Sequence, residues 1–528
     1  MASLKVCKIG GRYYLYDRES YWDPVMKKSK QRNSRYIGPC DKAGNLLEPA
    51  RPRIDAVHSA FPVGALSIFY ATAARIGLTD KIASVLDVNR GPASLVLSLA
   101  LNQLVSRRPI ERLPEWMLRS PLVEWEGIEP ELVTSDAFGA ALWSLCKMAP
   151  DGTFEDRGLV LQKELTKVWR EDTREPAQFY YDVTKQVYNG SACDYAEPGY
   201  FPGGTRKRVI GFGMVTSRIN HHPVLCRAIY GSRNDTVTVE DTVNHLRAWE
   251  FKRLTLIVDR GMISQENVET ALDAGFDMIG LIPETNKQAW EYVTKWPADE
   301  IEQPRFVVER SSGEAAYARS WVASILGRKR MRVSVIVSPR RKIEEQTSRD
   351  VMVRDVDRVT GKLRLKELRA DLGPLAIPAT GRRGFVIDEE KAGRDRKADG
   401  RYLMFSTDLD VDAEEMFTAY FQRDIVEKAF RVVKGEISLG PIRYRRRDRI
   451  DAYTTVVYVA YLLWSLAERR LREKHPEMSL SRALALVESV AAVRFRAGKR
   501  FYEWTTKLSA SQEQVLKHLG ATEFLPVA

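Results

Sequence analysis

The spacing of apolar and polar residues changes several times along the chain, and each change predicts a different kind of element. Residues 1–50 alternate aromatic and polar positions, a pattern typical of a small β-meander. Apolar residues then recur at helical spacing, for example over 64–78 and 92–108, and this pattern extends to residue 175. We therefore expect a basic, β-rich N-terminal arm over 1–50 and a helical N-terminal domain over 51–175.

From residue 179 the pattern becomes that of short strands, followed by alternating helices and strands. Three runs separated by turn residues predict an antiparallel meander. A helix with acidic residues in its first turn follows, and then two mostly apolar runs separated by a helix that Ser264 can cap. Such runs predict strands buried on both faces, so the order predicts a mixed α/β sheet. These elements span 179–188, 209–218, 222–231, 235–251, 254–259, 264–275 and 277–283.

After Pro283 the regular pattern stops, and it resumes with a buried strand over 401–407. Scattered β-like runs and charged turns lie between, which indicates a β-rich insertion into the sheet domain. The longest apolar run, 453–467, is shorter than the ~20 residues that cross a bilayer, so we expect a core helix. Beyond the helical domain, the chain divides into a first core part, an insertion, a second core part and a basic C-terminal segment, at 176–283, 284–400, 401–469 and 470–528.

The segment 420–434 combines charged residues with the periodicity of a buried helix. At ~100° per residue, Tyr420, Arg423, Glu427 and Lys434 fall on one narrow polar stripe, and the opposite side is apolar. Such a stripe is ordinarily a solvated face, in which Glu427 pairs with Arg423 or Arg431 at helical spacing. The alternative is that the stripe belongs to a functional site.

Composition favours a polyanionic partner. The 528 residues contain 82 Lys and Arg against 70 Asp and Glu, which gives a net charge of +12. The five cysteines are scattered and form no CxxC pair, so neither a disulfide framework nor a zinc site is expected, and a reducing cytoplasm fits. The N-terminus lacks the apolar segment of a secretion signal, and we expect no association with a membrane.

Three carboxylates have the placement of a metal site. Asp182 shares one face of its predicted strand with Tyr180, and Asp259 ends another strand, where open α/β sheets bind ligands. If these two strands are neighbours, the aspartates converge, and Glu427 can join them from the helix after the last strand. Such a cluster requires cations between its members, and oxygen ligands select two Mg²⁺ or Mn²⁺ ions. Alternatively, Asp182 is an ordinary strand-edge residue and Asp259 shapes a turn.

The blocks FYYDVT, LIVDRGMIS and Y-x2-R-x3-E-x6-K, the last from Tyr420 to Lys434, resemble the three motifs of DDE transposases of prokaryotic insertion sequences. The subgroup is the one named for its YREK signature, in the insertion-sequence-four-like superfamily. The resemblance implies a ribonuclease H-like core in which Asp182, Asp259 and Glu427 are catalytic metal ligands. One position departs from the pattern, because Tyr453 stands where members often carry a histidine.

The resemblance also implies an activity and partners. Such enzymes cut double-stranded DNA at the terminal inverted repeats of an element, and join the 3′-hydroxyl to target DNA by two-metal in-line transfer, as dimers on DNA. We expect the chain in the cytoplasm of a prokaryotic cell, associated with the nucleoid, with 51–175 binding DNA. The alternatives are a non-cutting DNA-binding or regulatory derivative, and a metal-dependent nuclease without strand transfer. The expected DNA contacts are Tyr420, Arg423, Lys434, Arg443, Arg445 and Arg446, and the candidates for stacking on a flipped base, or otherwise for core packing, are Trp290, Trp296 and Trp321.

Overall fold

The fold is known from a computed structural model that describes most of the chain. Its residues group into two compact units: Met1–Phe61 with Ala491–Lys507 and Pro526–Ala528, and Pro62–Val490 with Leu508–Leu525. The domain boundaries expected near 50 and 175 lie outside the described residues. The structure describes residues 2–24, 26–45, 56–148, 153–170, 177–201, 205–284, 286–310, 313–358, 375–378, 385–497 and 500–526.

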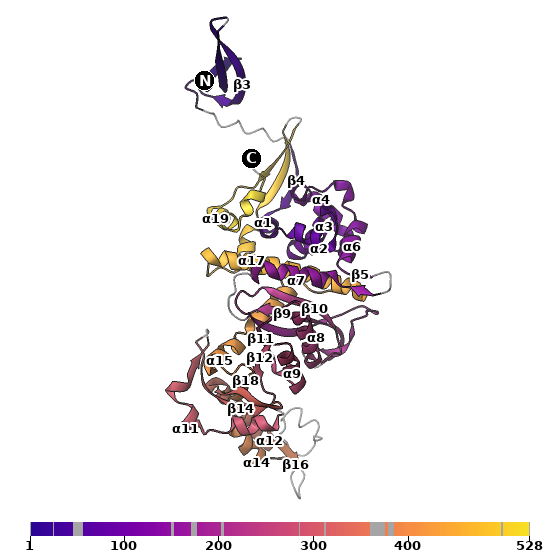
Figure 1. Ribbon diagram of the computed structural model, residues 1–528, viewed down its shortest axis with the longest axis vertical. Helices are drawn as coiled ribbons and strands as arrows, with labels where there is room; N and C mark the ends of the chain where they lie inside the picture. The colour runs from indigo at the N-terminus through magenta and orange to yellow at the C-terminus, as the bar shows by residue number, and fades with distance from the viewer. Residues whose placement is uncertain are drawn as a thin grey trace. The chain divides into compact units, whose positions relative to one another are not determined.

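The first unit consists of two small antiparallel sheets. The expected N-terminal meander is present as three consecutive strands (Figure 1). Residues 491–497 and 500–505 also form a pair of antiparallel strands, and the first of them pairs with a strand from the other end of the sequence. The strands are β1 (Ala2–Ile9), β2 (Arg12–Asp23) and β3 (Lys28–Cys40) in one sheet, and β4 (Ala56–Pro62), β19 (Ala491–Ala497) and β20 (Arg500–Thr505) in the other.

The second unit begins with the helical region that the periodicity predicts. Helix α3 is apolar around nearly its whole circumference and is correspondingly buried, as a central core helix should be. Thr134 caps α6 by accepting a hydrogen bond from the Ala137 amide. The α-helices are α1 (Gly64–Arg75), α2 (Leu78–Leu86), α3 (Arg90–Val105), α4 (Leu113–Arg119), α5 (Leu122–Glu126), α6 (Ser135–Ser144) and α7 (Arg157–Arg170), with short strands β5 (Lys147–Met148) and β6 (Phe154–Glu155) before the last.

A mixed sheet follows, in the order that the sequence pattern predicts. The meander strands β7, β9 and β10 are antiparallel, and β11 and β12 continue the sheet on the other side of β7, each parallel to its neighbour. This is the strand arrangement of a ribonuclease H-like core. A short strand that the pattern did not predict, β8, pairs with β9. The strands are β7 (Ala177–Val187), β8 (Glu197–Phe201), β9 (Thr205–Ser217), β10 (Pro223–Tyr230), β11 (Leu254–Val258) and β12 (Asp277–Leu281).

The insertion extends this same sheet. Strand β18 pairs with β12 on one side and with β15 on the other, so the sheet continues as β12-β18-β15-β14-β13. The expected runs at 305–310 and 332–338 supply β13 and β15. The elements here are α10 (Lys287–Val293), α11 (Ala298–Ile301), β13 (Val307–Glu309), β14 (Ala315–Ile325), β15 (Arg328–Val337), α12 (Pro339–Arg358), β16 (Ala376–Pro378), β17 (Phe385–Ile387), α14 (Glu389–Arg396) and β18 (Arg401–Ser406).

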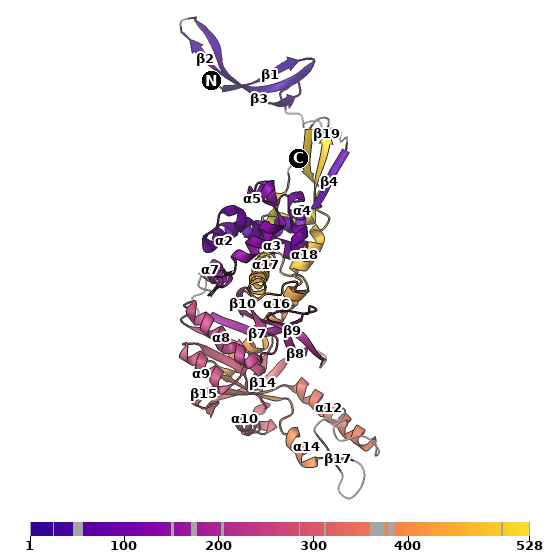
Figure 2. The same ribbon diagram turned by 90° about the vertical axis from the view of Figure 1, so that its right-hand side faces the viewer.

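Helices cover both faces of the core sheet, and neighbouring tyrosines of β7 identify the two faces. The Tyr181 hydroxyl donates to the Thr238 carbonyl in α8, at 3.4 Å, on the face that α8 and α9 share (Figure 2). The Tyr180 hydroxyl donates to the Ala419 carbonyl in α15, at 2.8 Å, on the opposite face. The helices are α8 (Asp235–Ala248), α9 (Gln265–Asp273), α15 (Ala413–Phe421) and α16 (Asp424–Lys434).

Helix α17 (Arg447–Lys474) passes through the core of this unit and packs against α1, α3, α7 and β10. Among the described residues it is the one helix long and apolar enough to span a membrane, and 83% of that apolar stretch is buried inside the protein, as expected for a core helix. It continues without a break past residue 470, where the C-terminal segment was expected to begin. Two helices follow, α18 (Leu480–Val487) and α19 (Ala510–Leu519).

The side chain of Gln162 bonds to backbone groups of β10, a strand at the edge of the sheet. Gln162 of α7 is buried, and its amide bonds both backbone groups of Cys226: the Cys226 N–H donates to Oε1 at 2.8 Å, and Nε2 donates to the Cys226 carbonyl at 3.1 Å. An edge strand otherwise leaves such groups unpaired. This single glutamine therefore joins the helical region to the sheet.

Replacing Gln162 by leucine should destabilise this junction. The change keeps the side-chain volume but leaves a buried N–H and a buried carbonyl unpaired, at a cost of about 2–4 kcal/mol. We expect a lower unfolding midpoint, and faster hydrogen exchange at the Cys226 amide, measured by mass spectrometry. Gln346→Leu, at an exposed position of α12, is the matched control and should change neither quantity. Unaltered exchange at Cys226 would contradict this role of Gln162.

Candidate active site

Asp182 lies in the middle of β7 and Asp259 follows the end of β11, and both come directly after the stretch over which these two parallel strands pair. Tyr181 of β7 pairs with Val258 of β11, and the two aspartates are the next residues on their strands. The expectation that these two strands are neighbours is therefore confirmed. Each carboxylate accepts a hydrogen bond from the backbone N–H of the residue after it, at 2.8 Å for Asp182 and 2.7 Å for Asp259. These local bonds fix both side chains at the same end of the sheet.

The signature segment 420–434 is two helices and not the single helix that its periodicity predicts. Tyr420 lies in the last turn of α15, and Arg423 immediately precedes α16, which carries Glu427 and Lys434. Between the helices the backbone bonds have three-residue spacing, as in Arg423 N–H to the Tyr420 carbonyl at 3.1 Å. This tighter turn brings Tyr420 and Arg423 to the same carboxylate.

Three donors converge on one oxygen of Asp259. Arg423 Nη1 lies 2.5 Å from Asp259 Oδ1, the Tyr420 hydroxyl donates to the same oxygen at 3.3 Å, and the Arg260 N–H donates to it as well. The Arg423 contact is an ion pair and not an aligned hydrogen bond, because Nη1 has no acceptor along its N–H direction. Arg423 Nη2 lies 3.6 Å from Glu427 Oε1, so one guanidinium contacts two of the three candidate carboxylates.

The pKa values of the two aspartates are shifted in opposite directions by burial and by the charges around them. Burial raises the pKa of Asp182 to about 6; the Val183 N–H and the charge of Arg423 oppose this shift, whereas Asp259 and Asp235 add to it. Burial acts in the same direction on Asp259, but the Arg423 guanidinium, the Arg260 N–H and the Tyr420 hydroxyl together hold the pKa of Asp259 below its usual value. Asp235, in the first turn of α8, is a neighbouring carboxylate that the sequence analysis did not single out. Its only signal was its place at the start of the helix after the meander.

Lys434 is the last residue of α16, at the opposite end of this helix from Arg423, and its ammonium lies near Asp182. Burial lowers the pKa of the Lys434 ammonium, and the negative charge of Asp182 opposes the shift. Burial likewise raises the pKa of Tyr420 to about 12, because the ring is almost completely enclosed. Tyr420 and Arg423 therefore face the carboxylates, and Lys434 reaches the same region from an exposed position.

The donor set suits a hard divalent cation, but the carboxylates are not drawn together. Within the described residues, no group of three or more His, Cys, Asp or Glu side chains is close enough to hold a metal ion. Instead the Arg423 guanidinium provides the counter-charge between Asp259 and Glu427. Carboxylate oxygens are what Mg²⁺ and Mn²⁺ prefer, and Oδ2 of Asp259 accepts no hydrogen bond from the described residues, so the chemistry of the set fits such ions.

The three other arginines expected to contact DNA are exposed in the loop before and at the start of α17. Arg443 and Arg445 extend from the loop, and Arg446 forms an ion pair with Asp448, with Nε donating to Oδ1 at 3.0 Å. Tyr453, at the position where relatives often carry histidine, is buried, and its hydroxyl donates to the Leu439 carbonyl at 3.1 Å. It is a packing residue here and does not reach the aspartates.

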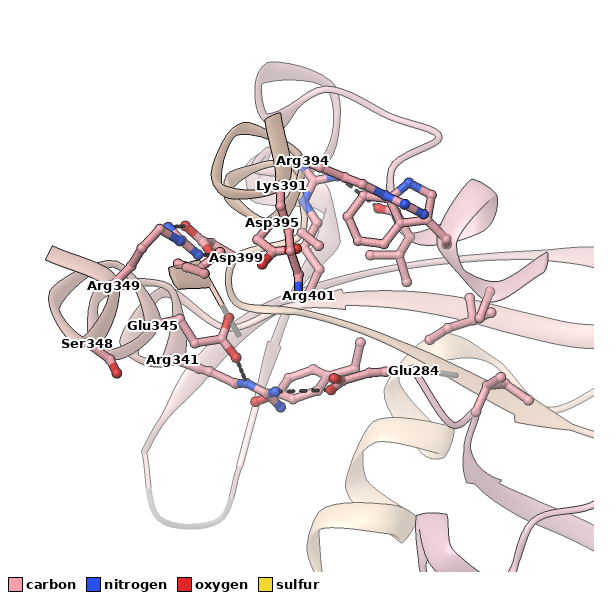
Figure 3. A pocket seen from close by; sticks show the side chains of 18 of the residues that line it. Glu284, Arg341, Glu345, Ser348, Arg349, Lys391, Arg394, Asp395, Asp399 and Arg401 are labelled. Carbon is pink, nitrogen blue, oxygen red and sulfur yellow. Dashed lines mark hydrogen bonds and ion pairs between the residues drawn. The ribbon is translucent and has the colours of Figure 1, made fainter. Parts of the chain in front are cut away.

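The insertion forms a cavity of about 900 Å³ (Figure 3), and Arg260 is part of its wall. Arg260, which follows Asp259, forms an ion pair with Glu284 at 2.6 Å, and Arg341 lies 3.4 Å from the same glutamate. Six basic side chains line the cavity, and they are balanced by six acidic ones. The basic residues are Arg260, Arg341, Arg349, Lys391, Arg394 and Arg401, and the acidic residues are Glu284, Glu345, Asp388, Glu390, Asp395 and Asp399.

The three tryptophans of the insertion have different surroundings. Trp296 and Trp321 pack edge to face with ring centroids 4.4 Å apart, which is the geometry of a local core. Trp290 lines the cavity instead, and the Arg394 guanidinium lies 4.6 Å from its ring centroid. Of the three, Trp290 has access to a ligand that enters this cavity.

Comparisons with known proteins place the chain in a family. The sequence model described as a transposase DDE domain matches residues 182–463, which is more than half of the 528 residues, so the chain belongs to this family. The match begins at Asp182 and includes Asp259 and Glu427. A cryo-EM structure of a piggyBac transposase synaptic complex with hairpin DNA aligns with 79% of this chain and 77% of its own, at 10% identity and a TM-score of 0.38. A comparison with curated proteins gives no match.

Removing the Arg423 guanidinium should increase the affinity of the carboxylates for divalent cations. Arg423→Ala takes one positive charge away from Asp259 and Glu427 and adds no other ligand. We expect Mn²⁺ to bind the DNA-free protein roughly tenfold more tightly, measured by titration calorimetry. Arg431→Ala, on an exposed position of α16, is the control and should leave the affinity unchanged. Weaker Mn²⁺ binding by Arg423→Ala would show that the guanidinium does not compete for these oxygens.

Proposed function

We propose that this member of the transposase DDE domain family is an active DNA transposase of a prokaryotic insertion sequence, in the subgroup with the YREK signature. It would cut double-stranded DNA at the terminal inverted repeats and join the 3′-hydroxyl to target DNA. The observation that carries the proposal is the placement of Asp182 and Asp259 directly after the last paired residues of two neighbouring parallel strands, with Glu427 linked to Asp259 through Arg423. Together with the family match, this arrangement retains all three acidic residues that the chemistry requires.

The proposed metal ligands are Asp182, Asp259 and Glu427. Two Mg²⁺ or Mn²⁺ ions bound there would activate the attacking oxygen and stabilise the leaving oxygen of an in-line displacement at phosphorus. The chain's own residues orient the ligands: the backbone amides of Val183 and Arg260 hold the two aspartates. Asp182 loses its proton near pH 6, so it is a charged ligand at neutral pH.

The basic residues around this site are proposed to hold the DNA backbone. Arg423 and Lys434 lie beside the aspartates, and an approaching phosphate would offer both cations an additional anionic partner. Tyr420 positions Asp259 through its hydroxyl. The exposed arginines Arg443 and Arg445, with Arg446, extend the positive surface toward α17. Two copies of the chain, one at each element end, would form the working dimer in the cytoplasm, on nucleoid DNA.

Conservative removal of each acidic charge tests the catalytic assignment. Asp182→Asn, Asp259→Asn and Glu427→Gln should each reduce cleavage of the element ends by at least about a thousandfold, because each change removes a ligand for the ions that stabilise the transition state. Binding to the ends should remain within a few-fold of wild type. The measurement combines gel-shift binding with cleavage and joining of labelled DNA that carries the inverted repeats, in Mg²⁺.

Asp273→Asn, at an exposed position of α9, is the matched control and should cut normally. Cleavage by any of the three site variants at wild-type rate would remove that residue from the catalytic set. Wild-type protein that binds the ends and never cuts them would indicate a non-cutting derivative. Cleavage without joined product would indicate a nuclease that lacks strand transfer.

The salt dependence of DNA binding tests the role of Lys434. If its ammonium contacts a phosphate, Lys434→Ala should weaken binding similarly for all sequences, and should lower the slope of log K against log salt by about one. Lys252→Ala is the control, because this exposed lysine precedes β11 and lies at the end of the strand opposite Asp259. A slope identical to that of wild type would assign Lys434 to the carboxylate site alone.

A further inference from the structure

A second cationic site lies on the opposite face of the core sheet from the carboxylates. It is a cavity of about 420 Å³ between β10, α8 and the start of α17. Tyr181 lines it, whereas Asp182, the next residue of β7, belongs to the other face. A smaller cavity of about 190 Å³ adjoins it, and Tyr195, Arg227 and Arg447 line both.

The larger cavity has an excess of positive charge. Arg227, Arg233 and Arg447 line it, and Asp241 is the one carboxylate in its wall. Arg233 forms an ion pair with Asp241 at 2.9 Å, and Arg447 lies 3.7 Å from Asp451, which lines the adjoining smaller cavity with Asp156. Of the three arginines, Arg227 is therefore the one that forms no ion pair with the described residues.

Arg227 has no acceptor of its own among the described residues. It forms no ion pair there, and the polar atom near its Nη1 is His245 Nδ1, at 3.5 Å. His245 Nδ1 lies 2.8 Å from the Asp241 carbonyl oxygen, which can only accept, so Nδ1 carries a hydrogen. The N–H groups of Arg227 Nη1 and His245 Nδ1 therefore face each other as two donors. The guanidinium N–H groups of Arg227 remain available to an anion.

Arg447 contacts Asp451 and two aromatic rings, those of Phe154 and Tyr195. Its Nε lies 3.7 Å from Asp451 Oδ2, and the Tyr195 hydroxyl contacts both oxygens of that carboxylate, at 2.8 and 3.0 Å. The hydroxyl thus provides the close contact to Asp451, and the arginine contributes mainly charge. Backbone N–H of Arg447 donates to Asp194 at 2.7 Å, which fixes the start of α17 beside the cavity.

We infer that this cavity is a phosphate-binding site, with Arg227 as its principal ligand and Arg233 and Arg447 as supporting cations. The two parallel N–H groups of a guanidinium match two oxygens of a phosphate, and Arg227 has no hydrogen-bond acceptor among the described residues, which favours an anion at this position. The ligand is a phosphate group, either from the DNA backbone or free in solution. The exposed arginines Arg443 and Arg445 lie just before Arg447 in the chain, so a DNA strand held by them is the nearest source.

Chemical protection of the wild-type chain tests the site without any substitution. Phenylglyoxal modifies accessible arginines, and peptide mass spectrometry reports the rate at Arg227. Separate samples contain millimolar inorganic phosphate, a duplex DNA of mixed sequence, or neither, all with EDTA so that no cleavage occurs. We expect phosphate, DNA or both to slow modification at Arg227 at least fivefold, and to leave Arg247, an exposed arginine of α8 outside the cavity, unaffected.

Two variants measure the contribution to DNA binding. Arg233→Gln removes an exposed positive charge. Arg227→Lys keeps the positive charge but removes the planar guanidinium that donates two parallel hydrogen bonds. DNA affinity should fall about three- to tenfold in each, and the salt slope should fall by about one for Arg233→Gln alone. Arg247→Gln is the matched control. The site is overturned if Arg227 reacts at one rate under all three conditions.

The source of the phosphate follows from the same data. Protection by inorganic phosphate with unchanged DNA binding supports a site for a free phosphate ligand and rejects the backbone as its source. Protection by DNA alone supports a backbone contact. The DNA result rests on the proposed function, whereas the phosphate result does not. Because these assays contain no metal and need no cleavage, their failure is distinguishable from a failure of the catalytic proposal.

Discussion

Electrostatic repulsion between acidic side chains is the constraint around which the candidate active site is built. Asp182 and Asp259 lie on or directly after the neighbouring parallel strands β7 and β11, and Glu427 approaches through α16, although the three described carboxylates are not drawn into one cluster. Arg423 offsets this repulsion by contacting Asp259 and Glu427 with separate nitrogens. Asp182 forms no ion pair with the described residues, and burial raises its pKa to about 6. The positive charge of Arg423 therefore offsets part of the negative charge of the site. A bound cation or phosphate would change this balance.

Successive side chains of β7 point to opposite faces of the sheet, so the residues near the carboxylates and those near the cationic cavity lie on different faces. Tyr180 and Asp182 face the helices that follow the last core strand, and Tyr181 faces α8 and the cationic cavity. A single strand thus supports two sites that share no side chain. This separation permits binding to be changed on one face while the carboxylates on the other keep their partners.

Sequence patterns predicted the parts of this arrangement that depend on local spacing. The meander, the strand that ends at Asp259, and the Ser264 cap of α9 all follow from periodicity and capping chemistry. The break between α15 and α16 before Arg423 does not follow from local spacing. There Tyr420 and Arg423 contact Asp259, which lies more than 160 residues earlier in the chain. The pairing of β15 with β18, which makes the insertion part of the main sheet, is likewise a long-range contact. Arg227 carried no motif at all.

The insertion cavity and the cavity beside α8 show why charge is a better guide to function than volume. The insertion cavity is about twice as large as the one beside α8, yet its six basic side chains face six acidic ones, and several are committed to ion pairs. An anion entering there must displace a carboxylate partner. At Arg227 the histidine nitrogen is itself a donor, so an anion that bonds to this guanidinium displaces no hydrogen-bond acceptor among the described residues. The smaller cavity consequently offers the lower desolvation cost and the more favourable charge for a phosphate.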